Sequence, residues 1–258
     1  MKDSNIQQRL QKLKVFNLAM AGLHAIQALA IAWLSSDFAL PVNASYLEFD
    51  PSSQGLVLMN TELFSLPLAW LIFAFLAISS IAHLAIATVY RQKYESNLVK
   101  GINKARWYEY SLSASIMMVA IAMLVGIYDI GSLIMVFALV AIMNLCGLIM
   151  EVHNQTTKKT NWISFNIGSL AGIVPWIVVG LYFWVSSSYG TGEIPTFVYW
   201  IYGSIFVFFN SFAINMILQY RKVGKWHDYI YGERTYIVLS LVAKSALAWQ
   251  VYGGTLQP

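Results

Sequence analysis

Lys244 is the residue with the most distinctive chemical setting in this sequence, because it is the single charge in the apolar stretch 236–249. It lies ten residues after Arg234. At about 1.5 Å per helical residue, that places it roughly 15 Å further along, near the middle of a hydrocarbon core about 30 Å thick. An ammonium group at that depth must be paired, deprotonated or chemically modified. A desolvated lysine also forms Schiff bases with carbonyl compounds. The stretch alone therefore leaves two interpretations, a structural lysine paired with a carboxylate or an attachment point for an aldehyde chromophore.

The lysine needs an acidic partner, and Glu109 is the best candidate. Of the twelve acidic residues, all the others fall at the ends of apolar spans or in loops, Glu151 and Glu233 among them. Glu109 reaches the depth of the lysine if the third membrane helix begins early, near Asn97. We expect that extension, because the alternative leaves a buried charge unpaired. The other interpretation of Glu109 is an acid at the membrane interface, paired with Arg106.

Several polar residues share helical faces with these two groups. Ser113 lies four residues after Glu109, Met117 continues that face by a turn, and Ser240 lies four residues before Lys244. Serines inside membrane helices often hydrogen-bond a backbone carbonyl, but near a charged pair they can also tune its ionisation.

His24 and His83 fall within the first and second apolar spans. They are either packing residues with satisfied hydrogen bonds or part of a polar cavity that receives a proton near Glu109. No third ligand with metal-site spacing accompanies them, so no metal is predicted.

The composition of the chain that positions these residues is typical of a membrane protein. Of its 258 residues, 58% are hydrophobic and 11% are charged, a charged fraction less than half that of a soluble domain. Seven apolar spans of helical length follow one another, at residues 14–36, 63–90, 105–128, 130–150, 162–186, 197–219 and 229–252. The sequence therefore predicts an all-α membrane protein, a bundle of seven transmembrane helices forming one domain over 1–258. The net charge of +4 does not indicate nucleic-acid binding, because the basic residues lie in short loops between spans.

Charge asymmetry predicts the orientation. Loops one, three and five contain no lysine or arginine, whereas the N-terminal segment and loops two, four and six contain several. The positive-inside rule then places the N-terminus in the cytoplasm and the C-terminus outside the cell membrane. Loop one, at about 37–62, is the longest and would be extracellular, and we expect a small hairpin there.

The chain resembles the heliorhodopsins, a family of microbial-type rhodopsins with inverted topology. The resemblance is carried by WYEYS at 107–111, GIVPW at 172–176, FFNSF at 208–212 and VLSLVAKSALAWQ at 238–250. It implies all-trans retinal bound covalently to Lys244 as a protonated Schiff base, with Glu109 as counterion. It also implies a homodimer in the lipid bilayer and a slow photocycle without established ion pumping.

A chromophore on Lys244 would be surrounded by residues of several spans. The expected pocket residues are Ser113, Ser240, Met117, Phe209, Tyr110, Pro175 and Trp176. Phe209 is the candidate for the place that tryptophan occupies in helix six of pump-type rhodopsins, with Phe206 and Phe208 as open alternatives. His24 and His83 form the expected proton-accepting region.

We therefore predict a light sensor that is not an enzyme and signals through an unknown cytoplasmic partner. The alternatives are a light-driven ion transporter or channel, and a seven-helix scaffold whose lysine is merely ion-paired.

Overall fold

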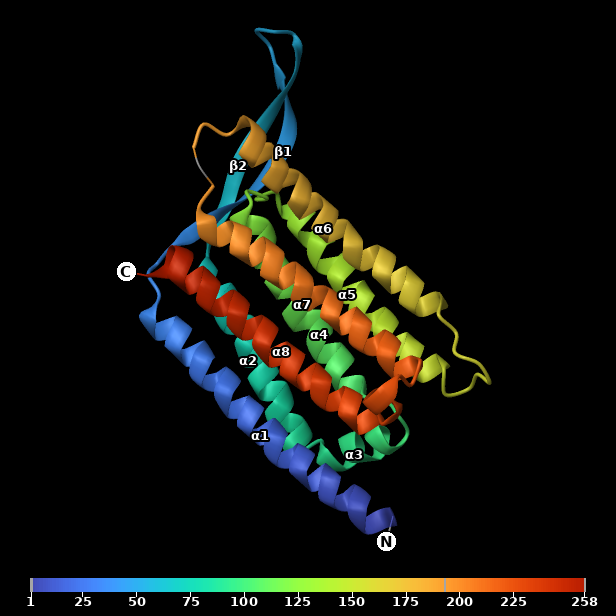
Figure 1. Ribbon diagram of the computed structural model, residues 1–258. Helices are drawn as coiled ribbons and strands as arrows, with labels where there is room; N and C mark the ends of the chain where they lie inside the picture. Colours follow the sequence, from blue (N-terminus) through green and yellow to red (C-terminus); the bar gives the residue numbers. More distant parts are fainter. Residues whose placement is uncertain (1, 193, 258) are drawn as a thin grey trace.

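The structure, a computed structural model, describes residues 2–192 and 194–257 and consists mainly of helices (Figure 1). Within these residues, seven helices are long and apolar enough to cross a membrane, so the predicted seven-span helical fold is confirmed. They are α1 (Lys2–Leu34), α2 (Leu68–Ala87), α4 (Lys104–Leu124), α5 (Ile130–His153), α6 (Ile163–Tyr189), α7 (Thr196–Tyr220) and α8 (Tyr229–Val251), which continues into a π-helical turn, Tyr252–Leu256.

Helix α4 is the centre of the bundle. Of the 18 consecutive residues that form its most apolar part, 72% are buried, against 22–39% in the other membrane-length helices described. It packs against α2 on one side and α5 on the other, while α7 and α8 cover it (Figure 1). Small or flexible side chains such as Ala120, Ala122 and Met123, all fully buried, allow this close packing. Residues of α4 therefore face the interior on nearly every side, which is where a buried site can be built.

A β-hairpin connects α1 and α2 and extends beyond one end of the bundle (Figure 1). Strands β1 (Ala39–Asp50) and β2 (Gly55–Pro67) pair antiparallel, with a register shift between Val42 and Asn43. The base is anchored, because Val42 is buried and the Asn43 N–H donates to the Tyr128 carbonyl at 2.8 Å. The hairpin expected in loop one is present, but its second strand continues to Pro67, past the predicted start of the second span.

The helix that carries Glu109 does not extend back to Asn97, so that expectation was wrong. A separate short helix, α3 (Arg91–Val99), ends before Gly101, which has a positive φ of 73°. Helix α4 then begins at Lys104, where the Asn103 side chain caps it by accepting the Arg106 N–H at 3.1 Å. A glycine in the left-handed region followed by a capping asparagine stops one helix and starts the next.

Glu109 nevertheless reaches the level of Lys244 because α4 starts inside the bundle. Five residues separate Lys104 from Glu109 and fifteen separate Tyr229 from Lys244. At about 1.5 Å per residue, the two offsets are roughly 7.5 and 22 Å, so α4 begins about 15 Å deeper than α8. The polar start of α4 is thus enclosed by neighbouring helices, which explains why its first turns carry buried polar side chains.

Candidate functional site

Lys244 and Glu109 form a direct, buried ion pair. The Lys244 Nζ donates to the Glu109 Oε1 at 2.7 Å, and the two side chains are 4% and 8% exposed. The same Nζ donates to the Ser240 Oγ at 3.0 Å, and Ser79 on α2 donates to the Glu109 Oε1 at 2.6 Å. Three helices therefore meet at one amine and one carboxylate. Among the described residues, Glu109 is the one carboxylate paired with this amine, so it can compensate a positive charge on the nitrogen.

The ion pairs of Glu109 and Arg106 decide between the two interpretations of Glu109. Glu109 pairs with Lys244, whereas the guanidinium of Arg106 bonds to other carboxylates. The interpretation of Glu109 as an interfacial acid paired with Arg106 is therefore wrong. Ser113 is fully buried on the same face of α4, and its Oγ has no hydrogen-bond partner among the described residues.

An apolar cavity begins at the Lys244 amine and is bounded by α4, α5, α6, α7 and α8. Its lining is mainly aromatic and aliphatic: Tyr110, Ser113, Ala114, Met117, Met118, Ile121, Met143, Asn144, Trp176, Ile205, Phe208, Phe209, Phe212, Ser240, Ala243 and Lys244. This lining suits a conjugated hydrocarbon with a carbonyl group at one end, because most of it is apolar or aromatic and it contains one primary amine. A buried primary amine in such a cavity can form a Schiff base with that carbonyl group.

The structure brings most of the predicted pocket residues to this cavity. Those that line it are Tyr110, Ser113, Met117, Trp176, Phe209 and Ser240. Pro175 is buried in α6 but does not line it. Among the three phenylalanines left open, Phe208 and Phe209 line the cavity, and Phe206 packs on the Trp176 ring from outside it, with ring centroids 5.2 Å apart.

Gly172 of α6 allows the wall of the cavity to close. A methyl group at that position would lie 2.4 Å from the Met143 Sδ and 3.3 Å from the Phe209 Cζ. The absence of a side chain lets these two residues pack directly against the α6 backbone. The glycine in the sequence segment at 172–176 thus has a packing reason.

His24 and His83 stack on each other next to the ion pair. Their ring centroids are 5.7 Å apart and their planes differ by 9°. The His83 Nδ1 lies 2.8 Å from the Asn17 Oδ1, while neither His24 nitrogen has a partner among the described residues. His83 lines a small polar cavity that Glu109 also lines. Within the described part of the chain, no group of three His, Cys, Asp or Glu side chains could hold a metal ion.

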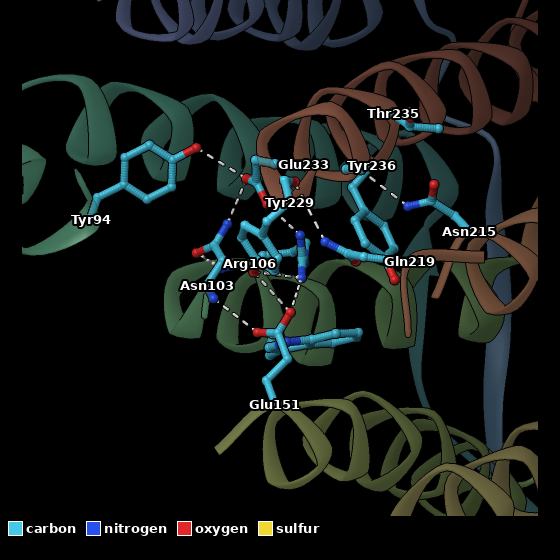
Figure 2. A network of polar contacts seen from close by, with 12 residues as sticks. Tyr94, Asn103, Arg106, Glu151, Asn215, Gln219, Tyr229, Glu233, Thr235 and Tyr236 are labelled. Carbon is cyan, nitrogen blue, oxygen red and sulfur yellow. Dashed lines mark hydrogen bonds and ion pairs between the residues drawn. The ribbon is translucent and has the colours of Figure 1, made fainter. Parts of the chain in front are cut away.

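A second buried charge cluster is centred on Arg106, about one turn before Glu109 on α4, and includes Tyr94 of α3 (Figure 2). Arg106 donates from Nη2 to the Glu151 Oε1 and from Nη1 to the Glu233 Oε2. Both acids are nearly fully buried, at 2% and 1% exposed. The Arg106 guanidinium also stacks over the Tyr236 ring, 3.9 Å from its centroid. The sequence predicted Glu151 and Glu233 at span ends or in loops and did not predict that both side chains are buried inside the bundle.

Neutral donors complete the hydrogen bonds of both acids. Glu151 accepts from the Trp107 Nε1 at 2.7 Å, from the Asn103 N–H at 2.8 Å and from the Tyr229 hydroxyl at 2.9 Å. Glu233 accepts from the Asn103 Nδ2 at 2.7 Å and from the Tyr94 hydroxyl of α3 at 3.0 Å. Burial, together with the nearby Glu233 charge, raises the pKa of Tyr94 well above its usual range, so this hydroxyl stays a donor. We call Arg106, Glu151, Glu233 and these donors the arginine network.

Helical spacing contains a signal that could have revealed this network. Glu233 lies seven residues before Ser240 and eleven before Lys244. Those intervals are close to whole turns, so all three share one face of α8. Likewise, Arg106 shares a face of α4 with Glu109 and Ser113. An arginine on the same face as a buried acid needs its own carboxylates, and Glu233 was in register to supply one.

Comparison with known families matches residues 13–256 to the heliorhodopsin family model. The match includes both helices that carry the ion pair, and all three charged residues of the arginine network. No curated protein matches the chain.

Proposed function

The chain belongs to the heliorhodopsin family, whose members are non-enzymatic, retinal-binding photoreceptors, and from that premise we propose that Lys244 is its retinal attachment site. The single observation that carries the proposal is the Lys244 amine, buried at the end of an apolar, aromatic cavity. Retinal, when bound, supplies the absorption of visible light and a change of shape on illumination. The protein residues supply the attachment, the counterion and the enclosure.

Glu109 is the proposed counterion. Its carboxylate lies 2.7 Å from the Lys244 nitrogen, and Ser79 and Ser240 add hydrogen bonds to the pair. A positive charge kept on that nitrogen would be stabilised by this one carboxylate. Four residues before Lys244 there is a serine, Ser240, where the pump-type rhodopsins carry an aspartate. Glu109 alone would therefore compensate the positive charge that two acids compensate in the pumps.

Light sensing without net ion pumping is the proposed activity. The stretch 116–126, which covers the rest of α4 and the two residues after it, consists of apolar residues and glycine, which offers no side chain that could carry a proton toward the hairpin end. His83 and the arginine network lie toward the α3 end of the pair, and His24 stacks on His83. A proton released from Lys244 would therefore move toward the histidines and return by the same side.

The proposed orientation puts the end with α3 in the cytoplasm. The loops at that end carry the lysines and arginines, as the positive-inside rule requires. An output to a cytoplasmic partner would then start from the arginine network, which ties α3, α4, α5 and α8 together at this end. The hairpin would lie outside the cell. Its exposed apolar residues, among them Leu56 (67%) and Leu58 (70%), support a homodimer contact there.

The deciding experiment is the visible spectrum of purified protein after addition of all-trans retinal, before and after hydroxylamine. Wild-type protein should be coloured and should bleach with hydroxylamine, and Lys244→Ala should fold but stay colourless. Lys104→Ala is the matched control, because that lysine lies on α4 outside the cavity. A visible pigment in Lys244→Ala would refute the attachment site.

Transport is tested separately by illuminating vesicles in the presence of a pH electrode. We expect no sustained pH change. A steady, protonophore-sensitive change under light would show net transport and would favour a light-driven transporter.

A further inference from the structure

A basic cleft opens at the end of the bundle that carries α3, away from the Lys244 cavity. Three connections form its walls: α3 to α4, α5 to α6, and α7 to α8, the last including a short 3₁₀ helix, Gly224–His227. Its volume is about 480 Å³, within the range of about 300–1,000 Å³ typical of small-molecule sites. The lining residues are Leu98, Val99, Lys100, Gly101, Asn154, Gln155, Thr157, Lys158, Lys159, Thr160, Gln219, Tyr220, Lys222, Trp226, His227 and Tyr229.

The cleft concentrates positive charge without compensation. Four lysines line it, Lys100, Lys158, Lys159 and Lys222, and the lining contains no aspartate or glutamate. Among the described side chains, none of these lysines has a carboxylate oxygen within 4.0 Å. Elsewhere at this end, Arg9 pairs with Asp228 and Arg91 pairs with Glu95. Several ammonium groups around one concavity attract a multiply charged anion.

The wall that carries two of the lysines is held in place by its own hydrogen bonds. The Asn154 Oδ1 accepts from the Asn161 N–H at 2.6 Å and from the Thr157 Oγ1 at 3.0 Å. The Asn154 Nδ2 donates to the Asn161 carbonyl at 3.1 Å. These bonds fix the loop between α5 and α6 on both sides of Lys158 and Lys159. A ligand would meet an organised surface and would not have to order the loop itself.

The opposite wall places a lysine where glycine is usual. Lys222 follows the last residues of α7 and has a positive φ of 53°. This left-handed conformation after a helix end favours glycine, because a side chain there is strained. The chain nevertheless carries a lysine at this position and lines the cleft with it. A binding role for its charge gives that strain a reason.

We propose that this cleft binds a phosphate-bearing anion. Lysines act as point charges for phosphate oxygens, and the hydroxyl and amide groups of Thr157, Thr160 and Gln155 add neutral hydrogen-bonding partners. Tyr220, Trp226 and Tyr229 contribute aromatic surface beside the charges. The phosphate group can belong to a soluble metabolite or to a lipid headgroup, and the chemistry of recognition is the same.

The position of the cleft links it to the interior. Tyr229 lines the cleft, and its hydroxyl donates to the Glu151 Oε1 at 2.9 Å. Gln219, also in the lining, donates weakly to the Tyr229 carbonyl at 3.5 Å. Tyr229 and Gln219 therefore belong both to the lining of the cleft and to the polar contacts around the arginine network (Figure 2). Only the Tyr229 side chain would then separate a bound anion from the Glu151 carboxylate of the arginine network.

The test uses the full-length protein in nanodiscs of zwitterionic lipid, titrated with inorganic pyrophosphate by calorimetry. Wild-type protein should bind, and Lys158→Gln/Lys159→Gln should bind at least about tenfold more weakly. The control Lys12→Gln/Lys93→Gln removes the same charge from exposed lysines outside the cleft, and its affinity should change less than about twofold. Equal weakening in both double variants would mean nonspecific attraction and would overturn the proposal.

A second arm distinguishes the source of the phosphate. Protein extracted from membranes containing phosphatidylglycerol is examined by native mass spectrometry. Retention of this lipid by wild-type and control protein, but not by Lys158→Gln/Lys159→Gln, would support a lipid headgroup. Failure of both pyrophosphate binding and lipid retention would refute the site. Both arms are repeated with Lys244→Ala, so that their result does not depend on whether the pigment forms.

Discussion

Replacing Arg106 should destabilise this protein more than replacing any exposed arginine. The Arg106 side chain is 3% exposed and bonds to two carboxylates that are equally buried. Arg106→Gln leaves both acids without their cation, and breaking a buried ion pair in this way costs about 3–5 kcal/mol. The stacking of the guanidinium on Tyr236 adds about 1 kcal/mol to the loss. The total is comparable to a large part of the stability of a typical domain.

Arg91→Gln is the matched control for this experiment. Arg91 pairs with Glu95 one helical turn away, and its side chain is 32% exposed. Exposed pairs at this spacing contribute about 0.3–0.5 kcal/mol. The assay is heat or detergent denaturation of the purified pigment, followed by visible absorbance and circular dichroism. If Arg106→Gln and Arg91→Gln unfold under the same conditions, the arginine network does not stabilise the bundle.

A triple variant separates charge pairing from packing. Arg106→Gln/Glu151→Gln/Glu233→Gln removes the cation together with both of the acids that Arg106→Gln leaves unpaired. We expect the triple variant to be more stable than Arg106→Gln, because no uncompensated charge remains buried. A triple variant less stable than the single one would show that the shape and hydrogen bonds of the acids matter more than their charge.

Three further predictions concern the pigment, the orientation and the hairpin. Glu109→Ala should move the neutral-pH absorption of the pigment toward the ultraviolet in halide-free salt, because the Lys244 nitrogen loses its one carboxylate; an unchanged pH titration would exclude Glu109 as counterion. A tag fused to the C-terminus should be reachable from outside intact cells and a tag on the N-terminus should not, and the reverse labelling would overturn the orientation. Leu58→Asp should convert a dimer in detergent to monomer without loss of colour, since Leu58 is 70% exposed near the hairpin tip; an unchanged mass by light scattering would exclude this contact.

Much of the fold could be predicted from the sequence because membrane helices are recognisable by their length and hydropathy. The prediction of element boundaries failed where the same sequence pattern suits two kinds of structure. The apolar residues just before Pro67 suit either a span or a strand, and pairing with β1 makes them a strand. Hydropathy also gives no depth for a helix start. Gly101 and Asn103 carried that information, as the residues that end α3 and cap α4.

Part of the candidate site could also be predicted from the sequence, and part of it could not. Lys244 stood out because a charge at mid-span is costly, and its encounter with Glu109 followed from the need for a partner. The reason given for that encounter, a longer helix, was wrong. Glu151 and Glu233 escaped notice because a position near the end of an apolar run looks exposed when the neighbouring helices are unknown. Their burial depends on α3 and on the connections at that end of the bundle, which no local pattern describes.

The arginine network also has a consequence for how the chain assembles during synthesis. Its cation enters the membrane with α4, one acid follows with α5, and the other arrives with α8, 127 positions after Arg106. Until that last segment leaves the ribosome, the guanidinium has one of its two anions and Asn103 lacks its Glu233 partner. The helix that completes this neutralisation is the one that carries Lys244. A chain that stops short of α8 therefore lacks the second acid of the arginine network, and the helix that completes the network also brings the proposed attachment site, Lys244, into the bundle.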